Sequence, residues 1–192
     1  ARNNQEVQDY LQKVRSYDLQ QNQNDIYNSP NKDWQKQIIH LVGGSTTGEQ
    51  FLIQNYMKTM AEILEADLYA GNVTSLIKNS SIPFHPNELN EIIQRIRDGV
   101  SLITFFGHNS SANSGFEINI DDPTNWNNQG KYPILLANSC YNGNIFGTGE
   151  SFSERFVRIP NAGPIAYISS TQQAFAQHLA AYSVRFYNDF SK

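Results

Sequence analysis

Four short runs of apolar residues constrain the fold more than any other feature of this sequence. In each run, apolar residues occupy both faces of the strand that the run would form. Each run ends in glycine or a polar loop. Strands buried on both faces are typical of a parallel sheet covered by helices. We therefore predict parallel strands at residues 38–42, 101–106, 133–137 and 164–168.

Helical patterns separate these runs. Apolar residues recur at helical spacing from Phe51 to Leu64 and again from Leu89 to Ile96. Further helices are expected at 150–158 and 172–190, and a short fifth strand near 72–77. This alternation predicts a three-layer α/β/α domain with a mainly parallel sheet, whose functional sites lie at the carboxyl ends of the strands.

A chain of 192 residues suits one compact domain. Apolar residues spaced three and four apart near the start predict a helix over about residues 6–16, followed by a polar linker. We expect residues 1–37 to be a lead-in helix and linker, and residues 38–192 to form the domain. No run approaches the roughly 20 apolar residues of a membrane-spanning helix, so no membrane span is expected. Nor do the first ten residues show the pattern of a signal peptide.

Charge and cysteine content exclude several classes of function. The chain has 14 Lys and Arg against 18 Asp and Glu, a net charge of -4, so we expect neither nucleic acid nor an anionic membrane as a partner. Its 22 Asn and 15 Gln predict a surface solvated largely by amides. A single cysteine, Cys140, excludes an internal disulfide and a multi-cysteine metal site.

Two polar segments that directly follow predicted strands hold the candidate reactive groups. His108 follows the second of the four apolar runs, and Cys140 follows the third. If those strands are parallel neighbours, both side chains emerge at the same edge of the sheet, where the imidazole can take the thiol proton and activate the sulfur. Gly107 and Gly143 would let a substrate backbone approach closely. A lone cysteine is more often a small buried hydrophobe, so packing and catalysis both stay open on the residues alone.

The order of motifs around these residues resembles that of the gingipain-type cysteine peptidases. The likeness covers nearly the whole chain, and it rests on Trp34, the segments 42–44 and 99–102, Gly107 and His108, Trp126, Tyr132 and Pro133, and the segments 138–146, 153–156, 162–166 and 168–173.

The resemblance implies a caspase-like fold and thiol-dependent hydrolysis of peptide bonds. His108 and Cys140 fall on the family's catalytic histidine and cysteine, and the backbone amides of Asn109 and Cys140 on its oxyanion site. The loop that lines the family's specificity pocket corresponds to Ser170, Thr171, Gln172 and Gln173. The resemblance also implies a polypeptide substrate, export by the type IX secretion route of Bacteroidetes, and contact with further domains of a larger protein.

Three departures from the family pattern bear on activity. Asn109 stands where the family usually has glycine, and Val42 stands where it has a carboxylate that orients the histidine. The loop after Gly44 is short and leaves Glu49 as its only carboxylate. Glu49 is therefore the candidate that selects a basic substrate side chain, the alternative being a residue that only complements a helix dipole.

The sequence leaves two alternatives to a peptidase function open. Val42 and Asn109 favour a peptidase-like domain that binds or scaffolds without cleaving. The glycine-containing loop 42–48 is a weak sign of nucleotide binding, because it lacks the lysine of a phosphate-binding loop. No cofactor is required for the peptidase chemistry.

Two lesser predictions concern metal and histidines. Asp121 and Asp122, with nearby asparagines at 119, 125 and 127, are candidate ligands of a structural calcium ion, and a solvated turn is the alternative. We expect His40, inside a strand, and His178, on an apolar helix face, to be packed or hydrogen-bonded structural residues.

Overall fold

Five parallel strands form a single sheet in the computed structural model, which describes all residues except 1, 23–28, 79–85, 109–121 and 148. The strand order is β2-β1-β3-β4-β5, and every neighbouring pair is parallel. The strands are β1 Gln37–Val42, β2 Asn72–Ile77, β3 Leu102–Phe106, β4 Ile134–Asn138 and β5 Ala166–Ser169. The parallel sheet predicted from the apolar runs is confirmed, and so is the fifth strand.

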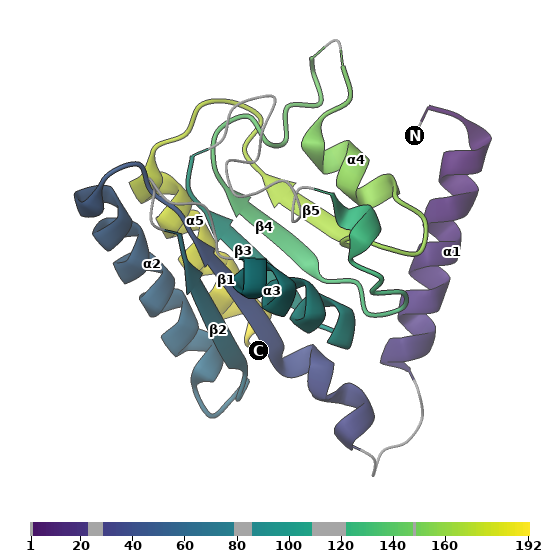
Figure 1. Ribbon diagram of the computed structural model, residues 1–192, viewed down its shortest axis with the longest axis horizontal. Coiled ribbons are helices and arrows are strands. Elements are labelled where there is room, and N and C mark those ends of the chain that lie inside the picture. The colour runs from purple at the N-terminus through teal and green to yellow at the C-terminus, as the bar shows by residue number, and fades with distance from the viewer. Residues whose placement is uncertain (1, 23–28, 79–85, 109–121, 148) are drawn as a thin grey trace.

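Helices cover both faces of this sheet, which makes the three-layer α/β/α arrangement (Figure 1). Helices α2 and α5 pack on one face, and α3 and α4 on the other, while α1 lies beside α4. The helices are α1 Asn4–Gln21, α2 Thr47–Glu65, α3 Pro86–Asp98, α4 Phe152–Arg158 and α5 Ala176–Phe190, with short 3-10 helices η1 Ser29–Lys36 and η2 Pro123–Asn125.

Alternate residues of the central strands pack into two separate hydrophobic cores, one on each face of the sheet. Ile39, Ile103 and Leu135 pack against α3 and α4 together with Ile96 and Phe156. Their neighbours along the strands turn to the opposite face and join the core under α2 and α5; these are Ile38, Leu102 and Leu136. Both faces of β3 are therefore buried, which explains why every residue of that strand except Thr104 is apolar.

The first helix is longer than the predicted 6–16 and is fixed to the body of the molecule by polar contacts. Lys13 is buried, and its Nζ donates to the carbonyls of Val157 (3.1 Å) and Ile159 (3.3 Å) at the end of α4. Burial lowers the pKa of Lys13 to about 7. The Tyr10 hydroxyl donates to the carbonyl of Ile165, just before β5. The division of the chain at residue 37 stays a prediction.

A polar network lies between the sheet and α5. The Tyr187 hydroxyl is 2.7 Å from His40 Nε2 on β1 and 2.6 Å from Thr104 Oγ1 on β3. Burial lowers the pKa of His40 to about 3, so this imidazole is neutral at physiological pH, and its predicted structural role is confirmed. The same expectation for His178 is wrong, because His178 is exposed and contacts the Phe175 ring.

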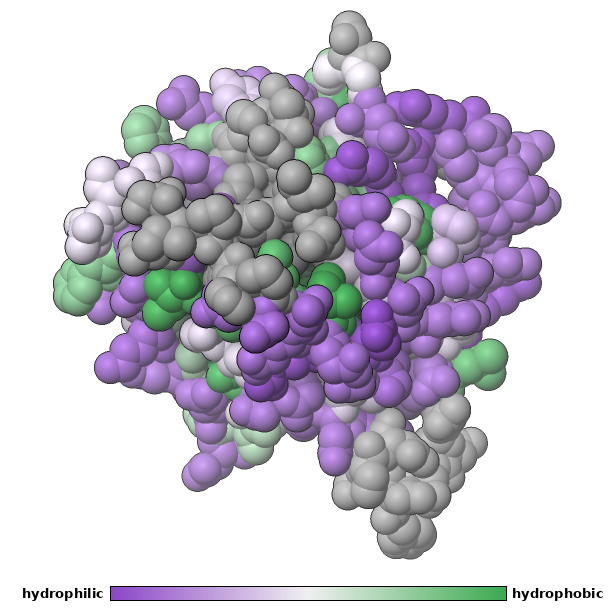
Figure 2. Space-filling model, viewed as in Figure 1, coloured by the Kyte–Doolittle hydropathy of each residue, from purple (hydrophilic) through white to green (hydrophobic). Residues whose placement is uncertain are grey.

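The surface is mostly hydrophilic on the face that carries α3 and α4 (Figure 2), as expected of a chain rich in amides. Among the described residues, no helix combines the length and the hydropathy needed to cross a bilayer.

Replacing Tyr187 by Phe tests the polar network under α5. The variant leaves His40 Nε2 and Thr104 Oγ1 without the hydroxyl that they share, so we expect a loss of about 1–3 kcal/mol in the free energy of unfolding. Tyr182→Phe on the same helix is the matched control, since Tyr182 is 57% exposed, and it should change stability by less than about 0.5 kcal/mol. Denaturant unfolding of both variants measures this, and equal effects would contradict the account.

Candidate active site

Strands β3 and β4 end in register at the edge of the sheet where the candidate reactive residues lie. Phe106, the last residue of β3, pairs with Asn138, the last residue of β4, and the amide of Gly107 donates to the Asn138 carbonyl at 3.1 Å. His108 and Cys140 each follow two residues later. The condition that their strands be parallel neighbours is thus confirmed, and both residues leave the sheet at the same edge.

Glu49 lies beside His108. The Glu49 Oε1 atom is 2.5 Å from His108 Nε2, and the Glu49 side chain is the less exposed of the two. The other carboxylate oxygen, Oε2, accepts from the amide of Ser45 at 2.7 Å. Glu49 also belongs to the first turn of α2, where its own amide donates to the side chain of Thr46, the N-cap residue. One carboxylate therefore serves the helix start and the histidine together.

Two glycines bring the start of α2 close to the end of β3. The amide of Gly43 donates to the Phe106 carbonyl at 2.8 Å, and a Cβ at Gly43 would lie 3.2 Å from the Cα of Gly107. Gly44 has a φ of +142°, and a Cβ there would lie 2.9 Å from the backbone of Gln50 in α2. The turn from β1 into α2 thus needs residues without side chains, and this tight turn places Glu49 next to His108.

The segment that carries Cys140 is joined by backbone hydrogen bonds to the segment after β5. The amide of Tyr141 donates to Gln172 O at 3.2 Å, and the amide of Gly143 donates to Ser170 O at 2.9 Å. Ser170 Oγ in turn donates to the carbonyl of Ser139 at 2.6 Å. Cys140 is partly buried. These bonds hold the cysteine between the ends of β4 and β5.

Ala174 is the described residue in contact with the sulfur. Its amide donates to Cys140 Sγ at 3.5 Å, and its carbonyl oxygen lies 3.7 Å from the same atom. Because residues 170–174 contact the cysteine segment in this way, α5 begins at Ala176 rather than at the predicted residue 172. An N–H directed at sulfur can stabilise negative charge that develops there.

Tyr141, directly after the cysteine, has a φ of +60°. A positive φ is uncommon for a bulky residue, and such strained positions cluster at functional sites. A hydrogen bond from the buried Asn142 Nδ2 to Ser139 Oγ, at 2.7 Å, closes this turn. Sequence reasoning missed Tyr141, because its residue type does not indicate a left-handed backbone.

The two glycines predicted to admit substrate have close neighbours within the fold. A Cβ at Gly107 would lie 3.0 Å from the Phe105 ring, and one at Gly143 would lie 2.6 Å from Ser169 Oγ. Close packing is thus a sufficient reason for both glycines, and their part in substrate binding stays a prediction. So does that of Thr171, Gln172 and Gln173, which are exposed.

Two predictions fall wholly or partly outside the described residues. Asn109, the expected oxyanion donor, lies outside them, and so do Asn119 and Asp121 of the candidate calcium site. Asp122 is described, and its Oδ1 accepts from the amide of Thr124 at 3.1 Å as the N-cap of η2. In the described part of the chain, no cluster of three or more metal-ligating side chains occurs.

Comparison with solved structures relates this fold to known peptidases. The structure of gingipain R, an Arg-specific cysteine proteinase, aligns with a TM-score of 0.73 at 15% identity over 100% of this chain and 43% of its own. A structure described as a protease aligns with a TM-score of 0.68 at 18% identity over 96% of this chain and 38% of its own. A complex of the pro- and mature domains of RgpB from Porphyromonas gingivalis aligns with a TM-score of 0.62 at 16% identity over 94% of this chain and 42% of its own.

This chain therefore spans less than half the length of these structures, and the likeness shows a caspase-like fold. No curated protein matches the sequence. The family model of peptidase family C25, however, matches residues 1–192. The gingipain-type resemblance of the sequence is thereby confirmed, and the chain belongs to peptidase family C25.

Proposed function

We propose that this chain is the catalytic domain of a cysteine endopeptidase, with Cys140 as nucleophile and His108 as general acid and base. The observation that carries the proposal is the register of β3 and β4, which end side by side and release His108 and Cys140 at one edge of the sheet. Family membership supports peptide-bond hydrolysis as the reaction.

In the proposed mechanism the Cys140 sulfur attacks the carbonyl carbon of the scissile bond, and the thiol proton passes to the His108 imidazole. That proton then goes to the leaving amine, and water hydrolyses the thioester that remains. Backbone amides of Cys140 and Asn109 would hold the oxyanion, as the family resemblance implies. The Ala174 amide, 3.5 Å from the sulfur, would stabilise negative charge on the thiolate.

Glu49 takes the part of the family carboxylate that orients the catalytic histidine. Val42, at the position where the family has a carboxylate, is buried among apolar residues of the α2 and α5 core. Glu49 reaches His108 from the start of α2 instead. A carboxylate on Nε2 fixes the orientation of the ring and leaves Nδ1 to exchange a proton with the sulfur. We infer that Glu49 is a positioning residue.

The proposal extends to the substrate, the location and the domain contacts of the protein. The substrate is a polypeptide, and the protein is exported to the cell surface or beyond, by the type IX route in a Bacteroidetes source, as the family resemblance implies. The complex between pro- and mature domains of RgpB supports contacts between this chain and further domains.

Cys140→Ala and His108→Ala test the reaction. We expect Cys140→Ala to reduce turnover of a mixed peptide library in the full-length protein at least about a thousand-fold, because the nucleophile is lost. Alkylation of Cys140 by an iodoacetamide probe should slow markedly in His108→Ala, since the base is lost. Mass spectrometry of the labelled peptide measures this.

Thermal unfolding of the same variants is the control. Unchanged turnover in Cys140→Ala would end the cysteine-peptidase proposal. Loss of folding with Cys140→Ala would show instead that the cysteine is a packing residue. A folded wild-type protein that neither cleaves peptides nor labels at Cys140 would favour the non-catalytic, peptidase-like binding domain that Asn109 and Val42 suggested.

Glu49→Gln separates positioning of the histidine from capping of α2. Glutamine at the third helical position serves a helix start as glutamate does, so stability should hardly change. We expect kcat to fall about tenfold or more, with KM nearly unchanged and equal losses for basic and neutral substrates. Glu62→Gln, on the exposed side of the same helix, should leave kcat unchanged. A loss confined to substrates with Arg or Lys before the cleaved bond would show that Glu49 selects a cation.

A further inference from the structure

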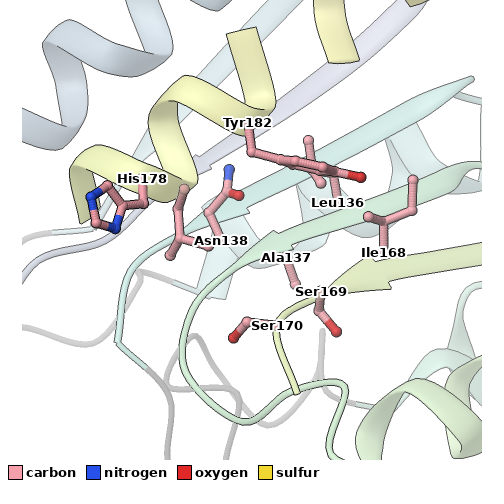
Figure 3. Close-up of a pocket in the computed structure, with 9 residues that line it drawn as sticks. Leu136, Ala137, Asn138, Ile168, Ser169, Ser170, His178 and Tyr182 are labelled. Carbon is pink, nitrogen blue, oxygen red and sulfur yellow. The ribbon is translucent and has the colours of Figure 1, made fainter. Parts of the chain in front are cut away.

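A cavity of about 380 Å³ lies between α5 and the ends of β4 and β5 (Figure 3). Its walls are mainly apolar, with Leu136 and Ile168 from the sheet and Leu179 and Tyr182 from the helix. In Figure 3 the Tyr182 ring lies across the cavity from the strands, and Asn138 projects from the end of β4 towards α5. A cavity of this size can hold one large side chain.

This cavity and the candidate nucleophile share the same two segments of chain. Asn138 lines the cavity and precedes Cys140 by two residues. Ser170 lines it from the other side and donates to the carbonyl of Ser139, next to the cysteine. A peptide whose carbonyl carbon reaches the sulfur therefore has this cavity beside the residue that is cleaved.

The charges around the cavity suit a neutral occupant. None of the described residues that line it is acidic, and His178 is the basic one among them. The Asn138 side chain is tied through Oδ1 to Ser183 Oγ at 2.9 Å. Its buried Nδ2 has no hydrogen-bond partner among the described residues, so the positive end of the amide dipole remains uncompensated at the cavity wall. That dipole disfavours a guanidinium or ammonium group.

Glu49 does not supply the negative charge that a basic side chain in the cavity would need. Its two carboxylate oxygens are engaged by His108 and by the Ser45 amide. A basic side chain that entered the cavity would lose its hydration and meet no carboxylate from the described residues that line the walls, which is costly for an ion.

We propose that this cavity binds the substrate side chain on the amino side of the cleaved bond and that it selects large uncharged side chains over Arg and Lys. This inference rests on the proposed peptidase function and names its substrate class. Leu, Met, Phe and Gln are the side chains that match the cavity's volume and lack of charge.

A peptide library in which only that residue varies, cleaved by the full-length protein, tests the inference. We expect kcat/KM for the neutral side chains to exceed that for Arg and Lys by at least about tenfold. Tyr182→Glu places a carboxylate at the cavity, and it should raise the ratio of kcat/KM for Arg to that for Leu by at least about tenfold. Gln177→Glu, at an exposed position of the same helix that does not line the cavity, is the matched control and should leave the ratio unchanged.

The outcomes separate the inference from the function on which it rests. Cleavage that depends on Cys140 but prefers Arg or Lys overturns the inference and leaves the peptidase in place. So does an equal change of the ratio in Tyr182→Glu and Gln177→Glu. No cleavage of any library member, with no labelling of Cys140 in the folded protein, overturns both.

Discussion

The in-register pairing of three parallel strands decides where every candidate reactive group lies. β1, β3 and β4 are neighbours, and their last residues, Val42, Phe106 and Asn138, are paired across the sheet. The three segments that leave the sheet at these residues carry Glu49, His108 and Cys140. A shift of one residue in either pairing would exchange the side chains of a strand between the two cores and would take His40 or Thr104 away from the Tyr187 hydroxyl, so the packing that stabilises the sheet also fixes the site.

Close packing and hydrogen bonds at this edge of the sheet position the side chains of the segments that follow the strands. Gly43 and Gly44 allow α2 to begin against the end of β3, which brings the Glu49 carboxylate to His108. On the other side, residues 170–174 hold the cysteine segment through backbone bonds and through the Ala174 amide at the sulfur. Tyr141, whose backbone is left-handed, belongs to this cysteine segment, and its amide donates to the Gln172 carbonyl.

Much of this arrangement could be predicted from the sequence, because parallel strands buried on both faces leave short runs of mostly apolar residues. Strand positions, the covering helices and the shared edge of His108 and Cys140 follow from that signal and from chain order. The contact between Glu49 and His108 does not, since it depends on how tightly the turn at Gly44 closes. The helix pattern placed the start of α5 too early, because residues 170–174 bond to the cysteine segment. The exposure of His178 also escaped prediction, since helical periodicity shows which residues share a face of a helix but not whether another element covers that face.

The central claim is that Cys140 and His108 act together on a peptide carbonyl at the carboxyl edge of the sheet. A crystal structure of the full-length protein after reaction with a peptidyl-leucine chloromethyl ketone tests it most directly. The account predicts a bond between Cys140 Sγ and the inhibitor's methylene carbon, His108 within hydrogen-bonding distance of the inhibitor or the sulfur, and the leucine side chain between β4, β5 and α5. An unmodified, packed Cys140 in a protein soaked with excess inhibitor would contradict the claim.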